Sequence, residues 1–375
     1  MIPFNKPFLT GNETKYIEQA VASGKISGNG MFTKKCQHFF ESKFGIKKAL
    51  LTTSCTDALE MCALLLDVTS EDEIIIPSYT FVSTANAFAL RGAKIVFADA
   101  SKHHPNIDAS KIEALITKQT KAIVVVHYAG VSCDMDAIMS IAKKHDIYVV
   151  EDAAQAIDSY YKGRPLGSIG HLATFSFHET KNIISGEGGL LAINDERFIE
   201  RSEIIWEKGT NRSAFFRGEI DKYGWVDLGS SFLPSEVIAA FLWAQLENLD
   251  SIQNKRKQLW NAYNKALKVL AQAGHFKLPQ IEEHASNNAH LFYIICKTNQ
   301  ERQALIEFLK SKDIKAVFHY LSLHKSSYYT DKHDGRALEM TDYYADHLLR
   351  LPLFYELELN DIDYIVSQIQ SFYEN

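Results

Sequence analysis

The chain has 375 residues, of which 46% are hydrophobic, and a formal net charge of −6. A chain of this length can bury a large core, and at about 150 residues per domain it predicts roughly two domains. The modest charge and the spread of lysines along the sequence exclude the basic stripe of a nucleic-acid-binding protein.

The cysteines and the N-terminal sequence indicate a cytoplasmic, soluble protein that does not bind a membrane. The cysteines are scattered without a CxxC pair, which is typical of reduced thiols. The first residues lack the charged and apolar regions of a signal sequence, and no apolar run approaches the roughly 18 residues of a membrane span. Because no cluster has zinc-ligand spacing, we expect no metal site.

The first 200 residues alternate short β-branched runs with helical patterns. Strands are predicted at residues 74–76, 95–97, 123–126, 148–150, 173–177 and 190–193. Their continuous apolarity favours strands covered on both faces, as in a largely parallel sheet. Met135 to His145 has apolar residues at helical spacing, and an apolar helix is expected from Ala58 to Leu66. These elements predict an α/β domain.

A different pattern follows the first domain. We predict one long helix over residues 235–271, then a strand at 291–296, a helix at 301–311, a strand at 314–318 and a final helix at 361–373. This predicts a large α/β domain over residues 1–250 and a small α+β C-terminal domain over residues 251–375. About the first 15 residues are expected to pack on the small domain.

Polar residues stand where several predicted strands end, which is where open α/β sheets bind ligands. They are Ser78, Asp99, His127, Asp152 and Ser176. Lys181 follows Ser176 closely, and a salt bridge to Asp152 is one interpretation of that pair. The other is a pyridoxal-phosphate (PLP) site, which needs an amine for a Schiff base and a carboxylate for the pyridine nitrogen.

The other requirements of PLP also have candidates. Ser176 and the turn at residues 54–57 could bind phosphate, although Ser, Thr and Asp at such a turn are also ordinary helix caps. Phe81 or Tyr79 could stack on the cofactor ring, although an aromatic residue here is also typical of a core.

Six stretches occur in order along nearly the whole chain: SGKISGNG, SCTDALE, IIIPSYTFVSTANA, VVEDAAQ, FSFHETKNIISGEGG and HYLSLH. Together they resemble the DegT/DnrJ/EryC1/StrS family of sugar aminotransferases. The resemblance implies an aspartate-aminotransferase-like fold (type I) and a homodimer with active sites at the subunit interface. It also implies that Lys181 forms the Schiff base with PLP and that Asp152 binds the pyridine nitrogen. The further cofactor contacts that it implies are Gln155 at the ring hydroxyl, Ser176 and the amides of Cys55 and Thr56 at the phosphate, and Phe81 on the ring.

Two positions depart from the family pattern. Cys55 precedes Thr56 where the family usually has Gly, so a side chain is added near the phosphate while the backbone donors remain. Residues 229–233 have the sequence GSSFL where the family commonly has GYNxR, whose Asn reaches the partner's phosphate. Ser231 or another residue must then take that role.

The GSSxL variant, together with KGTNR at residues 208–212 and FFRG, resembles one branch of the family. That branch moves the amino group of L-glutamate to C4 of dTDP-4-keto-6-deoxy-D-glucose, releasing 2-oxoglutarate. The product, dTDP-4-amino-4,6-dideoxy-D-galactose, serves surface polysaccharides such as enterobacterial common antigen and the O-antigen of lipopolysaccharide. Gluco stereochemistry, amination at C3 and a non-catalytic PLP-binding regulator remain alternatives. A PLP-dependent sugar dehydratase is disfavoured, because such members of the family have His in place of Lys181.

Six residues are candidates for binding the nucleotide sugar: His178, Lys208, Arg212, His319, Tyr320 and His324. His319, Tyr320 and His324 match a family HYxPLH segment, with Ser322 in place of Pro. Lys208 and Arg212, with Arg217, could meet the diphosphate, and a solvated basic face is the competing interpretation. A packing role is equally open for His178.

Overall fold

The computed structural model describes residues 1–374, and its centre is a seven-stranded sheet in the order β1-β9-β8-β5-β4-β2-β3. The strands are β1 (Lys48–Thr52), β2 (Glu73–Pro77), β3 (Lys94–Ala98), β4 (Thr120–Val126), β5 (Tyr148–Asp152), β8 (Leu172–Ser176) and β9 (Gly189–Ile193). Only β9 runs antiparallel to its neighbours, β1 and β8; the other pairs are parallel. The largely parallel sheet predicted from sequence is confirmed, with β1 as the strand that was not predicted.

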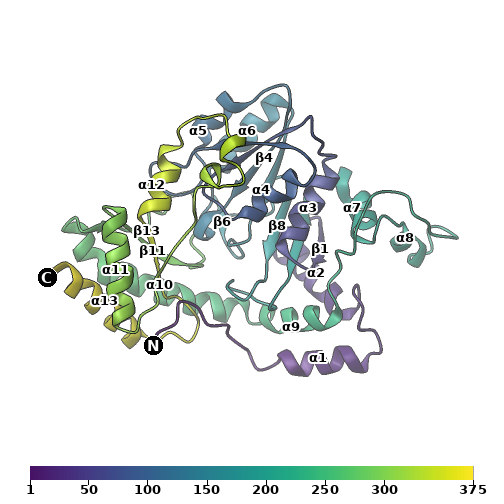
Figure 1. The fold of residues 1–375 in the computed structure, drawn as a ribbon. Helices are drawn as coiled ribbons and strands as arrows, with labels where there is room; N and C mark the ends of the chain where they lie inside the picture. Colours follow the sequence, from purple (N-terminus) through teal and green to yellow (C-terminus); the bar gives the residue numbers. More distant parts are fainter. Residues whose placement is uncertain (375) are drawn as a thin grey trace.

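Helices cover both faces of this sheet (Figure 1). One face packs on α2 (Met31–Phe44), α6 (Met135–His145) and α9 (Glu236–Leu246), and the other on α3 (Cys55–Leu65), α4 (Val82–Ala89) and α7 (Ile199–Trp206). In β2, Ile75 faces the first layer while Ile74 and Ile76 face the second. This alternation buries every side chain of the strand and explains its continuous apolarity.

A second, antiparallel sheet has the order β10-β11-β13-β12. Its strands are β10 (Phe276–Lys277), β11 (Phe292–Cys296), β12 (Val317–Phe318) and β13 (Leu348–Leu351). One face packs on α10 (Leu249–Gln272), α11 (Asn299–Ser311) and α13 (Leu359–Glu374). Ile2 pairs with Ile314, so the N-terminal segment lies against this smaller unit (Figure 1).

The remaining elements connect these layers or flank them. They are α1 (Glu13–Ala22), α5 (Ala109–Ile112), β6 (Tyr160–Tyr161), β7 (Arg164–Pro165), α8 (Arg212–Phe216), α12 (Glu339–His347) and short 3-10 turns at Glu113–Leu115, Tyr128–Gly130, Glu196–Phe198, Leu323–Lys325 and Thr330–Lys332. Figure 1 shows α8 on a segment that projects from the side of the large sheet.

Two predicted elements were wrong in extent. The single helix over residues 235–271 is two helices, because α9 ends at Leu246 and α10 begins at Leu249. Asn248, between them, donates from its side chain to the carbonyl of Ala244, a local bond that competes with continued helix. In the segment 314–318, only Val317–Phe318 forms a strand. The Ile314 amide instead donates to Leu309 O, in the last turn of α11.

The two sheets meet across a cluster of tyrosines. Tyr79 and Tyr128 follow β2 and β4 of the large sheet, and they pack with Tyr293 of β11 and Tyr344 of α12. This contact places the smaller unit beside the ends of the parallel strands, where Asp152 and Ser176 also lie. The boundary near residue 250 stays a prediction, because α10 is one helix that packs into both cores.

Candidate active site

Asp152 is the last residue of β5 and points toward α4. The Thr84 hydroxyl of α4 donates to Oδ2 at 2.7 Å, and the Ala154 amide donates to Oδ1 at 3.1 Å. Burial raises the pKa of Asp152, whereas these two donors and the charge of Lys181 act in the opposite direction. A carboxylate in this position is best stabilised by a further cation or N–H donor.

Lys181 lies in the loop between β8 and β9. Its amide donates to His178 O at 2.9 Å, and within residues 1–374 no group forms a hydrogen bond to its Nζ. Burial lowers the pKa of Lys181, and the positive charge of Arg350 lowers it further, whereas Cys55 and Asp152 raise it. A lowered pKa increases the fraction of neutral amine, which is the nucleophilic form.

The start of α3 forms a second polar edge beside these residues. Ser54 caps the helix by accepting from the Asp57 amide at 3.0 Å, and Thr56 Oγ1 donates to Ser83 Oγ at 2.8 Å. The amides of Cys55 and Thr56 have no hydrogen-bond acceptor in the described part of the chain. Free amides at the positive end of a helix dipole favour an anion.

Gly189 explains why glycine ends the GEGG turn. A Cβ at this position would lie 2.4 Å from Cys55 N and 2.3 Å from Ser54 C. Only glycine lets β9 start this close to the first turn of α3. Gly189 also pairs with Ser176 across β8 and β9, so the Ser176 side chain is held next to that turn.

Tyr320 lies near Gln155, His319 and Phe81, and these four residues form what we call the site wall. Gln155 accepts from the Ala129 amide at 2.6 Å and donates through Nε2 to the Tyr320 hydroxyl at 3.1 Å. His319 packs on Tyr320, with ring centroids 3.5 Å apart. Phe81, 57% exposed, lies 6.3 Å from the Tyr320 ring, whereas Tyr79 is 1% exposed in the core. Of the two aromatic candidates, Phe81 is therefore the accessible one.

Other predicted residues lie outside this group. His178 is half-buried and contacts Thr180 and Glu187. His324 is buried, bonded to Ser78 Oγ at 2.8 Å, and lies 3.6 Å from Asp342.

The projecting segment comprises residues 207–231 and includes α8. It contains Lys208, Arg212 and Ser231. Ser231 is exposed and pairs with Glu207 across an isolated bridge, and Arg212 lies 3.6 Å from Glu207. None of these three has a hydrogen bond or ion pair to Asp152 or Lys181.

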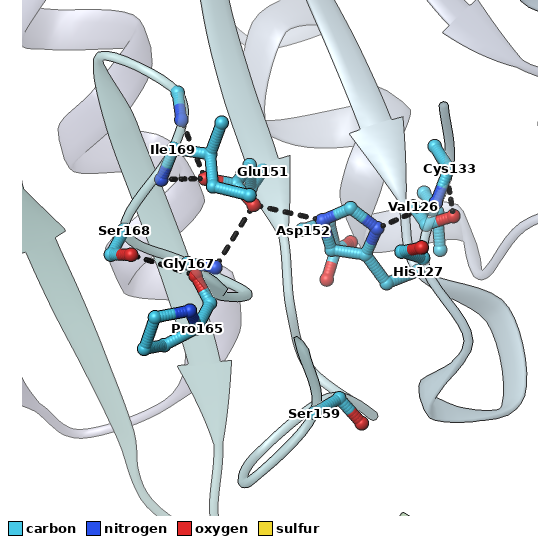
Figure 2. Close-up of polar contacts among 12 residues, drawn as sticks. Val126, His127, Cys133, Glu151, Asp152, Ser159, Pro165, Gly167, Ser168 and Ile169 are labelled. Carbon is cyan, nitrogen blue, oxygen red and sulfur yellow. Dashed lines mark hydrogen bonds and ion pairs between the residues drawn. The ribbon is translucent and has the colours of Figure 1, made fainter. Parts of the chain in front are cut away.

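Sequence reasoning missed Thr84, Arg350 and Glu151, and it identified His127 only as a polar residue at the end of a strand. Figure 2 shows Glu151, the neighbour of Asp152, on the opposite side of β5. Glu151 accepts from His127 Nε2 at 2.9 Å and from the amides of residues 167, 169 and 170 at 2.6–2.9 Å. Burial raises the pKa of Glu151, but these donors outweigh it and hold the pKa below its usual value. A second carboxylate next to Asp152, directly after the predicted strand at residues 148–150, was the available signal.

Comparison with known proteins decides the family. The DegT/DnrJ/EryC1/StrS aminotransferase family model matches residues 7–370. The chain belongs to this family. It is similar to the spore coat polysaccharide biosynthesis protein SpsC of Bacillus subtilis (30% identity, 98% of this chain and 96% of SpsC) and to GDP-perosamine synthase of Escherichia coli (29% identity, 100% and 99%). The structure of Spr1654 from Streptococcus pneumoniae, solved in a form with PMP, matches with a TM-score of 0.91, 26% identity and coverage of 100% and 99%.

As a member of this family, the chain is a PLP-dependent sugar aminotransferase with the aspartate-aminotransferase-like fold. Its residues fit the cofactor. The Lys181 amine has no hydrogen bond, the buried carboxylate of Asp152 requires a cationic partner, and the unpaired amides of α3 favour a phosphate. Across residues 1–374 no three His, Cys, Asp or Glu side chains are grouped to hold a metal, and no described helix is long and apolar enough to span a bilayer.

Replacing Glu151 by Gln should lower the free energy of unfolding by about 3 kcal/mol, because the amide N–H₂ would face buried donors. The pKa of Glu151 is lower in the folded chain, so its contribution is present above the ordinary glutamate pKa and is lost as the pH falls below it. Urea unfolding at several pH values measures both effects. Glu113→Gln, an exposed glutamate paired with Lys144, is the control and should change little. Equal stability of Glu151→Gln and wild type would contradict the assignment.

Proposed function

We propose that Lys181 binds PLP covalently through Nζ and that Asp152 binds the pyridine nitrogen. The state of these two side chains carries the proposal. The Lys181 amine has no hydrogen bond, and the buried Asp152 carboxylate is only partly stabilised by two neutral donors. Ser176 and the amides of Cys55 and Thr56 hold the phosphate, Gln155 contacts the ring hydroxyl, and Phe81 covers the ring. All of them come from the α3 and α4 side of the sheet or from the ends of its strands.

Bound PLP supplies the electron-accepting ring that makes the proton on the substrate's Cα acidic. Lys181 Nζ removes that proton from L-glutamate, and in the second half-reaction it delivers a proton to the aminated sugar carbon. Asp152 stays ionised so that the pyridine nitrogen keeps its proton. Gln155 Nε2 donates to the Tyr320 hydroxyl at 3.1 Å, and we propose that this pair limits access of water to Lys181.

We further propose that the acceptor is dTDP-4-keto-6-deoxy-D-glucose and the product dTDP-4-amino-4,6-dideoxy-D-galactose, with L-glutamate as donor and 2-oxoglutarate released. The support is the GSSxL, KGTNR and FFRG variant of the family motifs. The name of one relative points to a GDP-linked sugar, so the nucleotide is not inherited from the family as a whole. His319 and Tyr320 stand on the site wall, and Lys208 and Arg212 are proposed to reach the diphosphate from the partner subunit.

The projecting segment supports a homodimer. Phe216, Trp225, Val226 and Leu228 are all more than half exposed on it, and Trp225 reaches 81%. A group of exposed large apolar side chains on one segment is typical of a protein contact surface. We propose that this segment packs on a second copy and carries Ser231 to the partner's phosphate edge.

Lys181→Ala should abolish the visible absorbance of the covalently bound cofactor and lower turnover by about 1,000-fold or more, since the proton carrier is lost. Absorbance spectra and product formation are measured on the same preparation. Lys162→Ala, at an exposed lysine paired with Asp136, should keep both properties. Normal turnover by Lys181→Ala would rule out the assignment.

Incubation with L-glutamate and dTDP-4-keto-6-deoxy-D-glucose should yield the galacto 4-amino sugar, identified by NMR of the purified product. The ring couplings at C4 separate galacto from gluco products. Parallel incubation with the 3-keto isomer tests amination at C3, and the GDP-linked 4-keto sugar tests the nucleotide. A cofactor spectrum that does not change with any amino donor would favour the non-catalytic alternative.

Trp225→Asp should weaken self-association by about 30-fold or more, because a large buried aromatic at a contact is replaced by a charge. Sedimentation equilibrium measures the dimer dissociation constant. Val269→Asp is the matched control, since Val269 is also an exposed apolar residue, at 72%, but lies on α10. If both variants self-associate like wild type, the projecting segment is not the contact.

A further inference from the structure

Asn288, Ala289 and His290 form a strained turn just before β11. Ala289 has a φ of +54°, in the left-handed region that residues with a Cβ rarely adopt. Its amide donates to Asn287 Oδ1 at 2.8 Å, and the His290 amide donates to Asn288 Oδ1 at 3.0 Å. All three residues of the turn are buried. Strain of this kind persists where the surroundings hold the backbone, and such places cluster at functional sites.

Arg256 of α10 holds this turn in place. Its guanidinium donates to the carbonyl oxygens of Ala289 at 3.0 Å and His290 at 2.6 Å. Arg256 also lines one small cavity together with Lys181 and Asn182. The turn, which belongs to the smaller unit, therefore lies next to the loop that carries Lys181.

Asn288 binds the loop that follows Asp152 in the large sheet. Its Nδ2 donates to the carbonyl oxygens of Gln155 at 2.8 Å and Ile157 at 2.9 Å. A Cβ at Gly130 would lie 1.8 Å from Asn288 Oδ1, so only glycine leaves room for this side chain. The turn is thus joined to the backbone that carries Gln155.

Asn182, the residue after Lys181, binds the same turn with both of its polar atoms. Its Nδ2 donates to Asn288 O at 2.9 Å and to Gln253 Oε1 of α10 at 2.8 Å. Because a backbone carbonyl only accepts, the atom that faces it is Nδ2, and Oδ1 is the acceptor. Oδ1 lies 2.9 Å from His290 Nδ1, so this ring nitrogen carries the hydrogen.

His290 is a neutral ring that donates from Nδ1. Burial lowers its pKa well below the usual histidine value, and the positive charges of Lys181, Arg256 and Arg350 lower it further. Within residues 1–374 no group forms a hydrogen bond to its Nε2, so the ring binds Asn182 alone. It holds Asn182 without adding a further positive charge beside Lys181.

We propose that His290 is a positioning residue that fixes Lys181 through Asn182. Lys181 has to bring Nζ to the substrate's Cα in one half-reaction and to the sugar carbon in the other, and a small displacement of such a group slows both. Loss of the His290 donor leaves Asn182 Oδ1 buried without its partner, so the loop shifts. This inference rests on the proposed function, in which Lys181 binds the cofactor and carries the proton.

Stopped-flow absorbance of the holoenzyme measures the two half-reactions. In His290→Leu, which removes the donor, the rate constants of both should fall about 30-fold, while KM for L-glutamate and for the keto sugar stays within about threefold of wild type. His290→Asn places an amide N–H near the position of Nδ1 and should recover most of the rate. With L-glutamate deuterated at Cα, the isotope effect should rise in His290→Leu, because the proton transfer alone is slowed. A loss of stability would leave that isotope effect unchanged.

Hydrogen exchange of the apoenzyme tests the same contact without the reaction. Followed by mass spectrometry, exchange in the peptide over residues 177–186 should be faster in His290→Leu and in Asn182→Ala than in wild type, and slow again in His290→Asn. Combining His290→Leu with Asn182→Ala should reduce the rate little more than either change alone, since both remove one interaction.

His171→Leu is the matched control. His171 is a half-buried histidine whose Nδ1 accepts from the Val149 amide at 2.9 Å, at the opposite end of β5 from Asp152. This variant should match wild type in both half-reactions and in the isotope effect. Cofactor content and the midpoint of thermal unfolding show which variants are folded, and Asn182→Ala replaces His290→Leu if the latter is not.

Three results would overturn the role of His290. They are wild-type rates and exchange in His290→Leu, full additivity with Asn182→Ala, and an equal loss in His290→Asn and His290→Leu. If Lys181→Ala keeps normal turnover, the proposed function fails instead, and the exchange of residues 177–186 still decides whether His290 holds this loop.

Discussion

The pleat of β5 turns two neighbouring carboxylates, Glu151 and Asp152, to opposite faces of the large sheet. Glu151 is fully satisfied by His127 and by the amides of the turn that leads into β8. Asp152 accepts hydrogen bonds only from the Thr84 hydroxyl and the Ala154 amide, so it can still bind a cationic partner. A buried carboxylate without hydrogen-bond partners would destabilise the fold. Because Glu151 is fully hydrogen-bonded, the end of β5 is held in place, and this fixes the direction of the Asp152 side chain.

The rest of the site depends on close approach of backbone to backbone. Gly189 brings β9 against the first turn of α3, which sets the free amides of Cys55 and Thr56 beside Ser176. The change from the family's usual Gly to Cys55 alters a side chain and leaves these donors in place. Burial raises the pKa of the Cys55 thiol, so this cysteine stays protonated beside the proposed phosphate site.

Much of this arrangement could be predicted from sequence. Continuous apolar runs identified six strands of the large sheet, and the residues at their ends included Asp152 and Ser176. The family motifs then indicated an aminotransferase. Local patterns alone could not distinguish a PLP site from a salt bridge between Lys181 and Asp152. The break at Asn248 was missed, because it depends on one side-chain hydrogen bond to Ala244 within a sequence that otherwise favours helix.

Arg350 was missed for a different reason. It is an isolated charge in a short strand, and nothing around it in the sequence shows that β13 faces the ends of β2 and β4. Its neighbours Tyr79, Tyr128 and Phe318 are distant in sequence and meet it only through the packing of two sheets. Roles that depend on such long-range packing have no local sequence signal.

The continuity of α10 has a mechanical consequence. Its 24 residues span about 36 Å, with Leu249 and Ile252 anchored in the large core and Tyr263 and Leu267 in the smaller one. A rigid rod fixed in both cores resists hinge motion between them. Rearrangement around Lys181 and Asp152 should therefore occur through side chains and the N-terminal segment, and the two cores should lose their structure together when the chain is denatured.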